Sequence, residues 1–211
     1  MKDIKRVDLK RRIVDAAREV LLSEGYRNLS LRKIARKIDV SATSIYLHFE
    51  NKDHLVHTLI EEAIERLNER LEESVQSESS PLKMLENLAW AYVQFALDHP
   101  REYQVIYLVS SDQMARYPRE KFRKARQGYQ IVIEVLEEGV EAGTIEEPKP
   151  SIAAYTFWAQ LHGVMSVVLS RRLDTRIDQN EFIEEAIEHI ISAYQQKTVS
   201  DVKEVSRKNN I

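Results

Sequence analysis

The 211-residue sequence contains no cysteine and only five glycines and five prolines. The absence of cysteine excludes a disulfide-stapled fold, a thiol nucleophile and a metal site with thiolate ligands. The scarcity of glycine and proline, the residues that most often interrupt regular structure, favours long helices over many short strands. The N-terminus is charged and no apolar run follows it, so it does not resemble a signal peptide, and we expect a cytoplasmic protein.

The charge is unevenly distributed along the chain. The formal net charge of -3 conceals a balance of +6 in residues 1–52 and -9 in the remainder. A basic head on an acidic body indicates an anionic partner for the head alone, the alternative being local variation in a solvated surface.

Apolar residues recur at helical spacing along most of the chain, and strict alternation typical of strands is absent. The pattern predicts a first helix from about residue 8 to 24 that Gly25 ends. Ser30 and Ser41 can each cap a short helix, and Asn51 a longer one over about residues 52–73. We therefore predict an all-α fold of roughly nine helices.

The polar segment at residues 73–80 resembles a connection between two bodies. Pro81 can begin the next helix, which continues through Leu97, and a loop is expected near residues 114–118. Further helices should end near Ala142 and begin near Ser151 and Asp178. This organisation predicts a first domain at residues 1–52, a linking fourth helix, a second domain at 74–198 and a polar tail at 199–211.

The segment SLRKIARKIDVSATSIYLHFENKDHL, residues 30–55, predicts a helix-turn-helix. A major groove about 12 Å wide admits one helix, and the third helix can bury Ile45 and Phe49 while its small polar side chains face outward. Tyr46 and Lys52 carry long donors suited to phosphate oxygens, although each alone could be a packed aromatic or a solvated lysine. The candidate DNA-binding residues are Ser30, Arg32, Ser41, Ala42, Thr43, Ser44, Tyr46, Leu47, His48 and Lys52.

Over roughly residues 8–60, the sequence resembles the DNA-binding domain of the TetR (tetracycline repressor) family of bacterial transcriptional regulators. Gly25-Tyr26, the Ile-Ala pair of the second helix, Val40, Tyr46, Phe49 and Lys52 stand at family positions. Asp39 departs from the glycine usual in the inter-helix turn, but aspartate tolerates left-handed geometry. Ala42 stands where a larger polar residue is common, which leaves the operator sequence open. The resemblance implies a double-stranded DNA operator as partner.

The family's second domain binds a small-molecule effector and forms the homodimer, so the resemblance implies both for this chain. The stretch FWAQLHG resembles the Trp-x-x-x-His-Gly signature of one TetR subfamily through Trp158, His162 and Gly163. His162 could equally be a hydrogen-bonded interior histidine. The aromatic and adaptable side chains predict a mainly apolar effector. The candidate effector-binding residues are Trp90, Tyr103, Tyr107, Met114, Tyr129, Trp158 and His162.

Residues 151–170 contain no charged side chain. A segment of this length could span a bilayer, but its Gln160, His162 and hydroxyl residues and the lack of a second span argue against insertion. A helix that is apolar all round is buried on more than one side, so one side can face a partner subunit. The final helix adds a broad apolar stripe, and the predicted dimer interface comprises Ile183, Ala186, Ile187, Ile190, Ile191 and Tyr194.

A helical enzyme and a non-specific architectural DNA-binding protein are the two alternatives to a ligand-responsive regulator. A helical enzyme lacks support, because no metalloprotease, nucleophile-elbow or phosphate-loop motif is present, and no cofactor is predicted. His54 and His57 are spaced to share a metal but lack a convincing third ligand, so no metal site is predicted. A non-specific architectural DNA-binding protein is disfavoured by the acidic body, which would repel the duplex. The effector, the operator, the regulated genes and the direction of regulation do not follow from the sequence.

Overall fold

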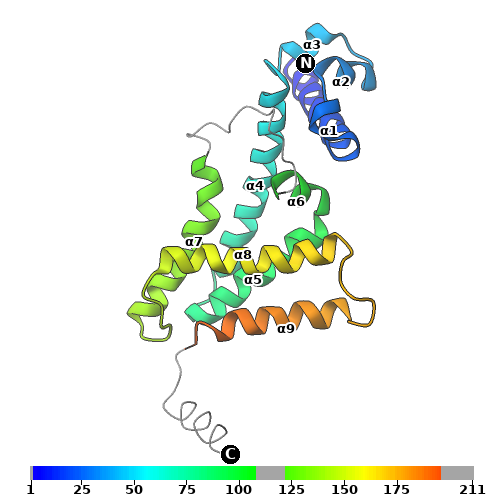
Figure 1. Ribbon diagram of the computed structural model, residues 1–211. Helices are drawn as coiled ribbons and strands as arrows, with labels where there is room; N and C mark the ends of the chain where they lie inside the picture. The colour runs from blue at the N-terminus through cyan, green and yellow to red at the C-terminus, as the bar shows by residue number, and fades with distance from the viewer. Residues whose placement is uncertain (1, 108–121, 196–211) are drawn as a thin grey trace, which may run out of the picture. The chain divides into compact units, whose positions relative to one another are not determined.

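The computed structural model describes residues 2–107 and 122–195 and confirms the predicted all-α fold (Figure 1). The nine helices of the described residues are α1 (Lys2–Asn28), α2 (Leu31–Lys37), α3 (Ala42–Tyr46), α4 (Lys52–Val75), α5 (Pro81–Asp98), α6 (Pro100–Tyr107), α7 (Phe122–Glu141), α8 (Pro150–Leu169) and α9 (Gln179–Ser192). The loop predicted near 114–118 and the predicted polar tail lie outside the described residues.

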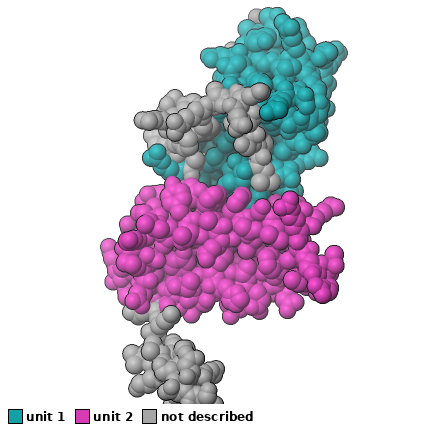
Figure 2. Space-filling view, viewed as in Figure 1, with its two compact units in different colours: residues 1–69, 95–127 teal, residues 70–94, 128–211 magenta. Residues whose placement is uncertain are grey.

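The chain divides into two compact units, which Figure 2 colours separately. The first comprises residues 1–69 and 95–127, and the second comprises residues 70–94 and 128–211. Helices α4, α5 and α7 each pass from one unit into the other. These units are defined by which residues pack together and not by function. The functional division predicted at residues 52 and 74 therefore stays a prediction.

In the first unit, α1, α2 and α3 enclose a hydrophobic core (Figure 1). Ile13, Ile34 and Ile45, one from each helix, have no exposed surface. Val105 of α6 joins the same core, and α6 packs against α1. Helices α1, α2 and α3 are therefore held as one body by a buried apolar core, to which α4 and α6 also contribute.

The first helix begins at Lys2, six residues before the predicted start. Gly25 has a φ of 78° and a ψ of 169°, which interrupts the helical backbone where the sequence predicts its end. Glycine suits this position because a side chain at positive φ is strained. The backbone turns there and places Tyr26 in the core, where it is 4% exposed.

Polar contacts also join the helices of the first unit outside the helix-turn-helix. The guanidinium of Arg66 on α4 lies 2.9 Å from the carboxylate of Glu102 on α6, and Glu102 is buried. Asn68 donates to the carbonyl oxygen of Lys124 at the start of α7, at 2.9 Å. Because a buried carboxylate is costly without a partner, the Arg66 ion pair fixes α6 beside α4.

In the second unit, α8 and α9 lie side by side (Figure 1). Asp178 caps α9 by accepting from the backbone N–H groups of Asn180 and Glu181, at 2.9 and 3.0 Å, and the helix begins next to Asp178 as predicted. The hydroxyl of Tyr194 donates to the carbonyl oxygen of Ala153 at 3.2 Å, which ties the end of α9 to α8.

Within a single chain, helix α8 is buried on one side only. The sequence predicted burial on more than one side, with one side able to face a partner subunit. Ala154, Phe157, Leu161 and Met165 are buried, whereas Ile152 is 59% exposed. By length and composition α8 could cross a membrane, as could none of the other described helices, and 33% of its apolar window is buried. An uncharged helix face is thus left uncovered in the single chain.

Candidate DNA-binding site and effector domain

The turn between α2 and α3 is built by local hydrogen bonds and one left-handed residue. Asp39 has a φ of 54°, which confirms that aspartate takes the left-handed conformation here. The backbone N–H of Val40 donates to the carbonyl oxygen of Ala35 at 3.0 Å. Arg12 donates from α1 to the carbonyl oxygen of Ile38 at 2.7 Å, so α1 fastens the end of α2.

Helix α3 presents an exposed face and buries the opposite one. Ile45 and Phe49 are 0% and 1% exposed, as predicted. Thr43 is exposed, Tyr46 is 51% exposed and Leu47 is 72% exposed. The outward residues of the predicted recognition helix are therefore accessible.

Other predicted contact residues are partly engaged within the protein. The hydroxyl of Ser41 accepts from the N–H of Ser44 at 3.1 Å and lies 2.8 Å from the Ser44 hydroxyl, which caps α3. Ser30 caps α2 by accepting from the N–H of Lys33 at 3.2 Å. Ala42 is half-buried against the core, and His48 is also half-buried. These residues position α2 and α3 at least as much as they offer groups to a ligand.

Lys52, the predicted phosphate contact, is held over an aromatic ring. Its ammonium lies 4.0 Å from the ring centre of Tyr26, a cation–π geometry. The hydroxyl of Tyr26 donates to the carboxylate of Asp53. Burial, and then the adjacent Asp53 carboxylate, raise the pKa of Tyr26 above its ordinary value, so the hydroxyl stays protonated as a donor. Sequence reasoning named Tyr26 only as standing at a family position and missed this role.

Part of the basic charge of the first unit is paired internally. Lys33 pairs with Glu24, Lys37 lies 3.1 Å from Glu19, and Arg18 lies 2.9 Å from Asp15. Arg32, a predicted DNA contact, is exposed on α2. The +6 balance already counts the carboxylates of these pairs, so the pairing leaves the net charge that a duplex would meet unchanged and fixes only which basic side chains have a partner.

The structure brings three of the predicted effector residues together in the second unit. Tyr129 of α7 packs edge-on against Trp158 of α8 with ring centres 5.7 Å apart, and Trp158 stacks on His162 at 5.2 Å. Tyr155, which sequence reasoning did not select, stacks on Tyr129 at 4.4 Å. Burial lowers the pKa of His162, so its ring is neutral at pH 7. The rings of Tyr129, Tyr155, Trp158 and His162 form a cluster that we call the aromatic ladder. The sequence signal that could have identified it is the spacing on α8, where the last three of these residues follow one another at three and four positions.

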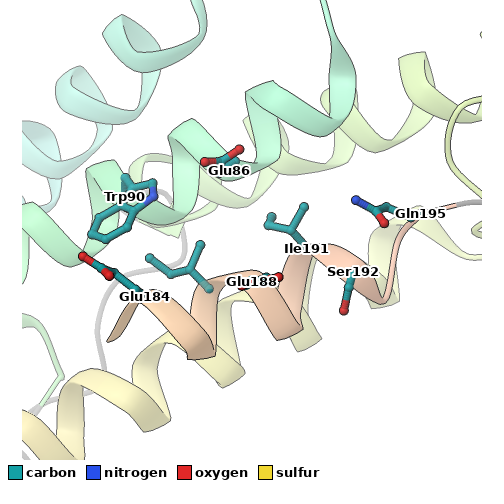
Figure 3. A pocket seen from close by; sticks show the side chains of 8 residues that line it. Glu86, Trp90, Glu184, Glu188, Ile191, Ser192 and Gln195 are labelled. Atoms are coloured by element: carbon teal, nitrogen blue, oxygen red, sulfur yellow. The ribbon is translucent and has the colours of Figure 1, made fainter. Parts of the chain in front are cut away.

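The remaining effector candidates lie elsewhere. Tyr103 and Tyr107 pair in the first unit, with ring centres 4.9 Å apart. Trp90 lines a cavity of about 380 Å³ between α5 and α9, which none of the other described effector candidates lines (Figure 3). Glu86, Glu184 and Glu188 surround that cavity, which makes it acidic. Met114 lies outside the described residues.

The residues predicted for the dimer interface face the interior of the chain. Ile183, Ile187, Ile190, Ile191 and Tyr194 are 2–7% exposed, and Ala186 is half-buried. The apolar stripe of α9 thus packs within its own subunit, and these side chains offer little surface to a partner. The amphipathic pattern identifies an apolar face but not what covers it.

The two histidines whose spacing suits a metal ion pack in or against the protein interior. His54 packs edge-on against Phe49, with ring centres 5.5 Å apart, and His57 is 5% exposed. Among the described residues, no group of three or more histidine, aspartate or glutamate side chains is placed to hold a metal ion.

A helix-turn-helix with an accessible recognition helix, joined to a separate helical unit, defines a DNA-binding transcriptional regulator. Residues 13–59 match the family model "Bacterial regulatory proteins, tetR family", and residues 85–190 match "Tetracyclin repressor-like, C-terminal domain". The protein belongs to the TetR family of transcriptional regulators, which are not enzymes.

Curated relatives and solved structures agree with this assignment. The chain is 28% identical to the fatty acid metabolism regulator protein of Bacillus subtilis over 64% of this chain and 70% of that one. It is 28% identical to the HTH-type transcriptional repressor KstR2 of Mycobacterium tuberculosis over 62% and 66%. A structure of a protein of unknown function from Rhodococcus sp. RHA1 is 26% identical, with a TM-score of 0.74 over 89% of this chain and 96% of that one.

Proposed function

We propose that this protein is a repressor that binds a pseudo-palindromic operator as a homodimer and releases it when a small, mainly apolar effector binds. The observation that carries the proposal is the exposed face of α3, presented by a buried core that α1, α2 and α3 share with α4 and α6. As such a regulator it acts in the bacterial cytoplasm.

The residues of the first unit divide into two roles. Thr43, Tyr46 and Leu47 are the exposed side chains of the recognition helix and meet the floor of the major groove or its edge. Lys52 and Arg32 meet phosphate oxygens, which hold the register of the helix without reading sequence. Ser30, Ser41 and Ser44 shape the two helices, Ala42 lets the backbone approach closely, and His48 flanks the contact.

The effector contacts we assign first are those of the aromatic ladder, Tyr129, Trp158 and His162, with Tyr155 added. Their planar faces with one neutral imidazole suit an apolar molecule that carries a polar group. The name of the Bacillus subtilis relative concerns fatty acid metabolism, and a long alkyl chain is an effector of this chemistry. Trp90, Tyr103, Tyr107 and Met114 remain candidates, and the Trp158-His162-Gly163 match supports the Trp-His-Gly subfamily.

The homodimer we propose uses the uncovered faces of α8 and α9. On α8 the exposed residues Ile152, Thr156, Ala159 and Gly163 repeat at helical spacing, and α8 carries no charge. On α9, Phe182, Ala186 and His189, followed by Ala193 at its C-cap, form a second stripe beside the buried one. Two copies related by a two-fold axis would bury both stripes in a four-helix bundle. The two recognition helices would then enter successive major grooves roughly 34–36 Å apart, or a multiple of that distance.

The proposal is tested by selecting binding sites from a random duplex library with the wild-type protein. A regulator should enrich one pseudo-palindromic sequence, and Lys52→Ala should weaken binding to every duplex and lower the salt slope by about one charge. Lys149→Ala, which removes an exposed lysine of the second unit, is the matched control. Addition of fatty-acyl compounds of graded chain length to the enriched duplex should then release the protein.

Contrary results separate the parts of the proposal. Enrichment of no sequence contradicts operator recognition, and an unchanged salt slope for Lys52→Ala contradicts its phosphate contact. Retention of the duplex at every chain length contradicts the fatty-acyl effector class.

A further inference from the structure

Large apolar side chains are exposed in the first unit only on the recognition helix, among the residues whose side chains the structure describes. Leu47 is 72% exposed and Tyr46 is 51% exposed, whereas the other exposed large hydrophobic residues, Val140, Ile152, Tyr155 and Ile177, belong to the second unit. A single exposed leucine is ordinary on a protein surface. Leu47, however, lies on the side of the recognition helix that would face the groove, where an apolar side chain can contact a base.

Leu47 shares its face of the helix with Thr43. The N–H of Leu47 donates to the carbonyl oxygen of Thr43 at 3.2 Å, so the two side chains lie one helical turn apart on the same side. Ile45, between them in sequence, points into the core and is fully buried. Both outward residues carry methyl groups, and the side chain of Leu47 has no polar atom.

The polar groups near this face are largely committed to the cap of α3. The Ser41 and Ser44 hydroxyls lie 2.8 Å apart, and Ser41 also accepts from the Ser44 N–H. Ala42 packs against the core. The exposed surface left to the base edges at this point is therefore mainly hydrocarbon, with the hydroxyl of Thr43 beside it.

In the major groove each base pair presents a pattern of donors and acceptors, and thymine alone adds a methyl group, at C5. A leucine side chain has no donor or acceptor with which to distinguish guanine, cytosine or adenine. We infer that Leu47, together with the methyl group of Thr43, selects thymine in each operator half-site by apolar contact with its 5-methyl group. This inference rests on the proposed function, because it assumes that α3 enters the major groove.

The experiment uses the duplex that the wild-type protein enriches from a random library. Each thymine is replaced singly by deoxyuridine, which removes one methyl group and keeps every hydrogen-bonding edge. At one or two positions per half-site, uracil should weaken wild-type binding about fourfold, the loss expected for one buried methyl. With Leu47→Ala, thymine and uracil should bind equally at one of these positions, whereas Ile177→Ala, which shortens an exposed apolar side chain of the second unit, should keep the wild-type discrimination.

The thymine-to-uracil comparison also separates the inference from the proposed function. Equal binding of thymine and uracil duplexes at every position overturns the inference while leaving operator recognition intact. Full discrimination in Leu47→Ala at all positions overturns the assignment to Leu47. Failure to enrich any duplex overturns the proposed function and this inference together.

Discussion

At the scale of single residues, Tyr26 contacts two groups of opposite charge. Its ring face lies under the ammonium of Lys52, and its hydroxyl donates to Asp53. The ring restricts Lys52 near the start of α4, and the hydroxyl holds the carboxylate of the neighbouring Asp53. Tyr26 is thus a positioning residue for the proposed phosphate contact.

We expect Tyr26→Leu to weaken DNA binding two- to fivefold, because it removes a cation–π contact of about 0.5–1 kcal/mol. Tyr26→Phe keeps the ring face and should retain most of the affinity. The measurement is duplex affinity against salt concentration for each variant, alone and combined with Lys52→Ala. If Tyr26→Leu weakens binding as much without Lys52 as with it, the tyrosine acts only through folding.

His162 gives a pH dependence whose sign follows from its surroundings. Burial lowers the pKa of His162 below its ordinary value of 6.5, because the charged imidazole is poorly solvated beside Trp158. The unfolded chain then takes up a proton at higher pH than the folded chain does. The stability that neutral His162 contributes is full above pH 6.5 and falls as the pH drops toward the folded pKa.

His162→Gln should therefore lose less stability than the wild type on acidification. Urea unfolding at about pH 7.5 and about pH 5.5 measures this difference for both proteins. His189→Gln, at an exposed histidine of α9, is the control and should behave as the wild type. An equal fall for wild type and His162→Gln would show that the burial of His162 does not set the effect.

At the scale of helices, the end of α7 depends on a glycine for packing and not for backbone conformation. A Cβ atom on Gly139 would lie 2.7 Å from Cγ1 of Ile145 and 3.0 Å from Cβ of Pro81, both closer than carbon atoms pack. Ile145 is 3% exposed, so its side chain has little room to move. Gly139 lets the turn after α7 and the start of α5 approach the same point of the helix.

We expect Gly139→Ala to destabilise the protein by about 1–3 kcal/mol, the usual cost of overpacking. Adding Ile145→Val removes the terminal methyl group that crowds the new side chain and should recover part of the loss. Urea unfolding of the two single variants and the double variant measures the coupling. Strictly additive losses would contradict a direct contact between the two positions.

At the scale of the whole molecule, the proposed dimer depends on surface that the single chain leaves open. A Cβ on Gly163 meets no atom of the described residues within 4 Å, so nothing in that part of the chain requires glycine there. Glycine in a helix costs about 0.5–1 kcal/mol relative to alanine. If a second copy of the chain approaches α8 closely at Gly163, the small size of glycine there would offset its cost to the stability of the helix.

Ala159→Glu and Gly163→Glu should give folded monomers, because each places a charge on the exposed face of α8 without entering the core. Light scattering at micromolar concentration, with circular dichroism to establish folding, is the measurement. Val140→Glu, at a 39% exposed apolar position on α7, is the matched control and should stay dimeric. Ile187→Glu should instead unfold the second unit, since Ile187 is buried. A wild-type protein that is monomeric at this concentration would contradict the proposed dimer.

The helices and the DNA-binding motif could be read from the sequence because their signals are local. Ser41 and Asp178 cap helices through atoms two or three residues away, Gly25 breaks α1, and Asp39 takes the left-handed turn. Such features depend on backbone geometry over a few residues, which periodicity and residue type report directly. The all-α class and the buried Ile45 and Phe49 follow from the same signals.

Only the tertiary structure decided which surfaces those helices share. The stripe of α9 reads as apolar whether its own subunit or a partner covers it, and packing against the rest of the second unit covers most of it here. Trp90 and Trp158 were both predicted effector contacts, yet one lines an acidic cavity and the other stands in an aromatic ladder. The contact of Tyr26 with Lys52 joins residues 26 positions apart, and no local pattern encodes such a pairing. Sequence therefore determined the elements and the class of protein, and three-dimensional packing determined which side chains meet, because burial depends on all neighbours at once.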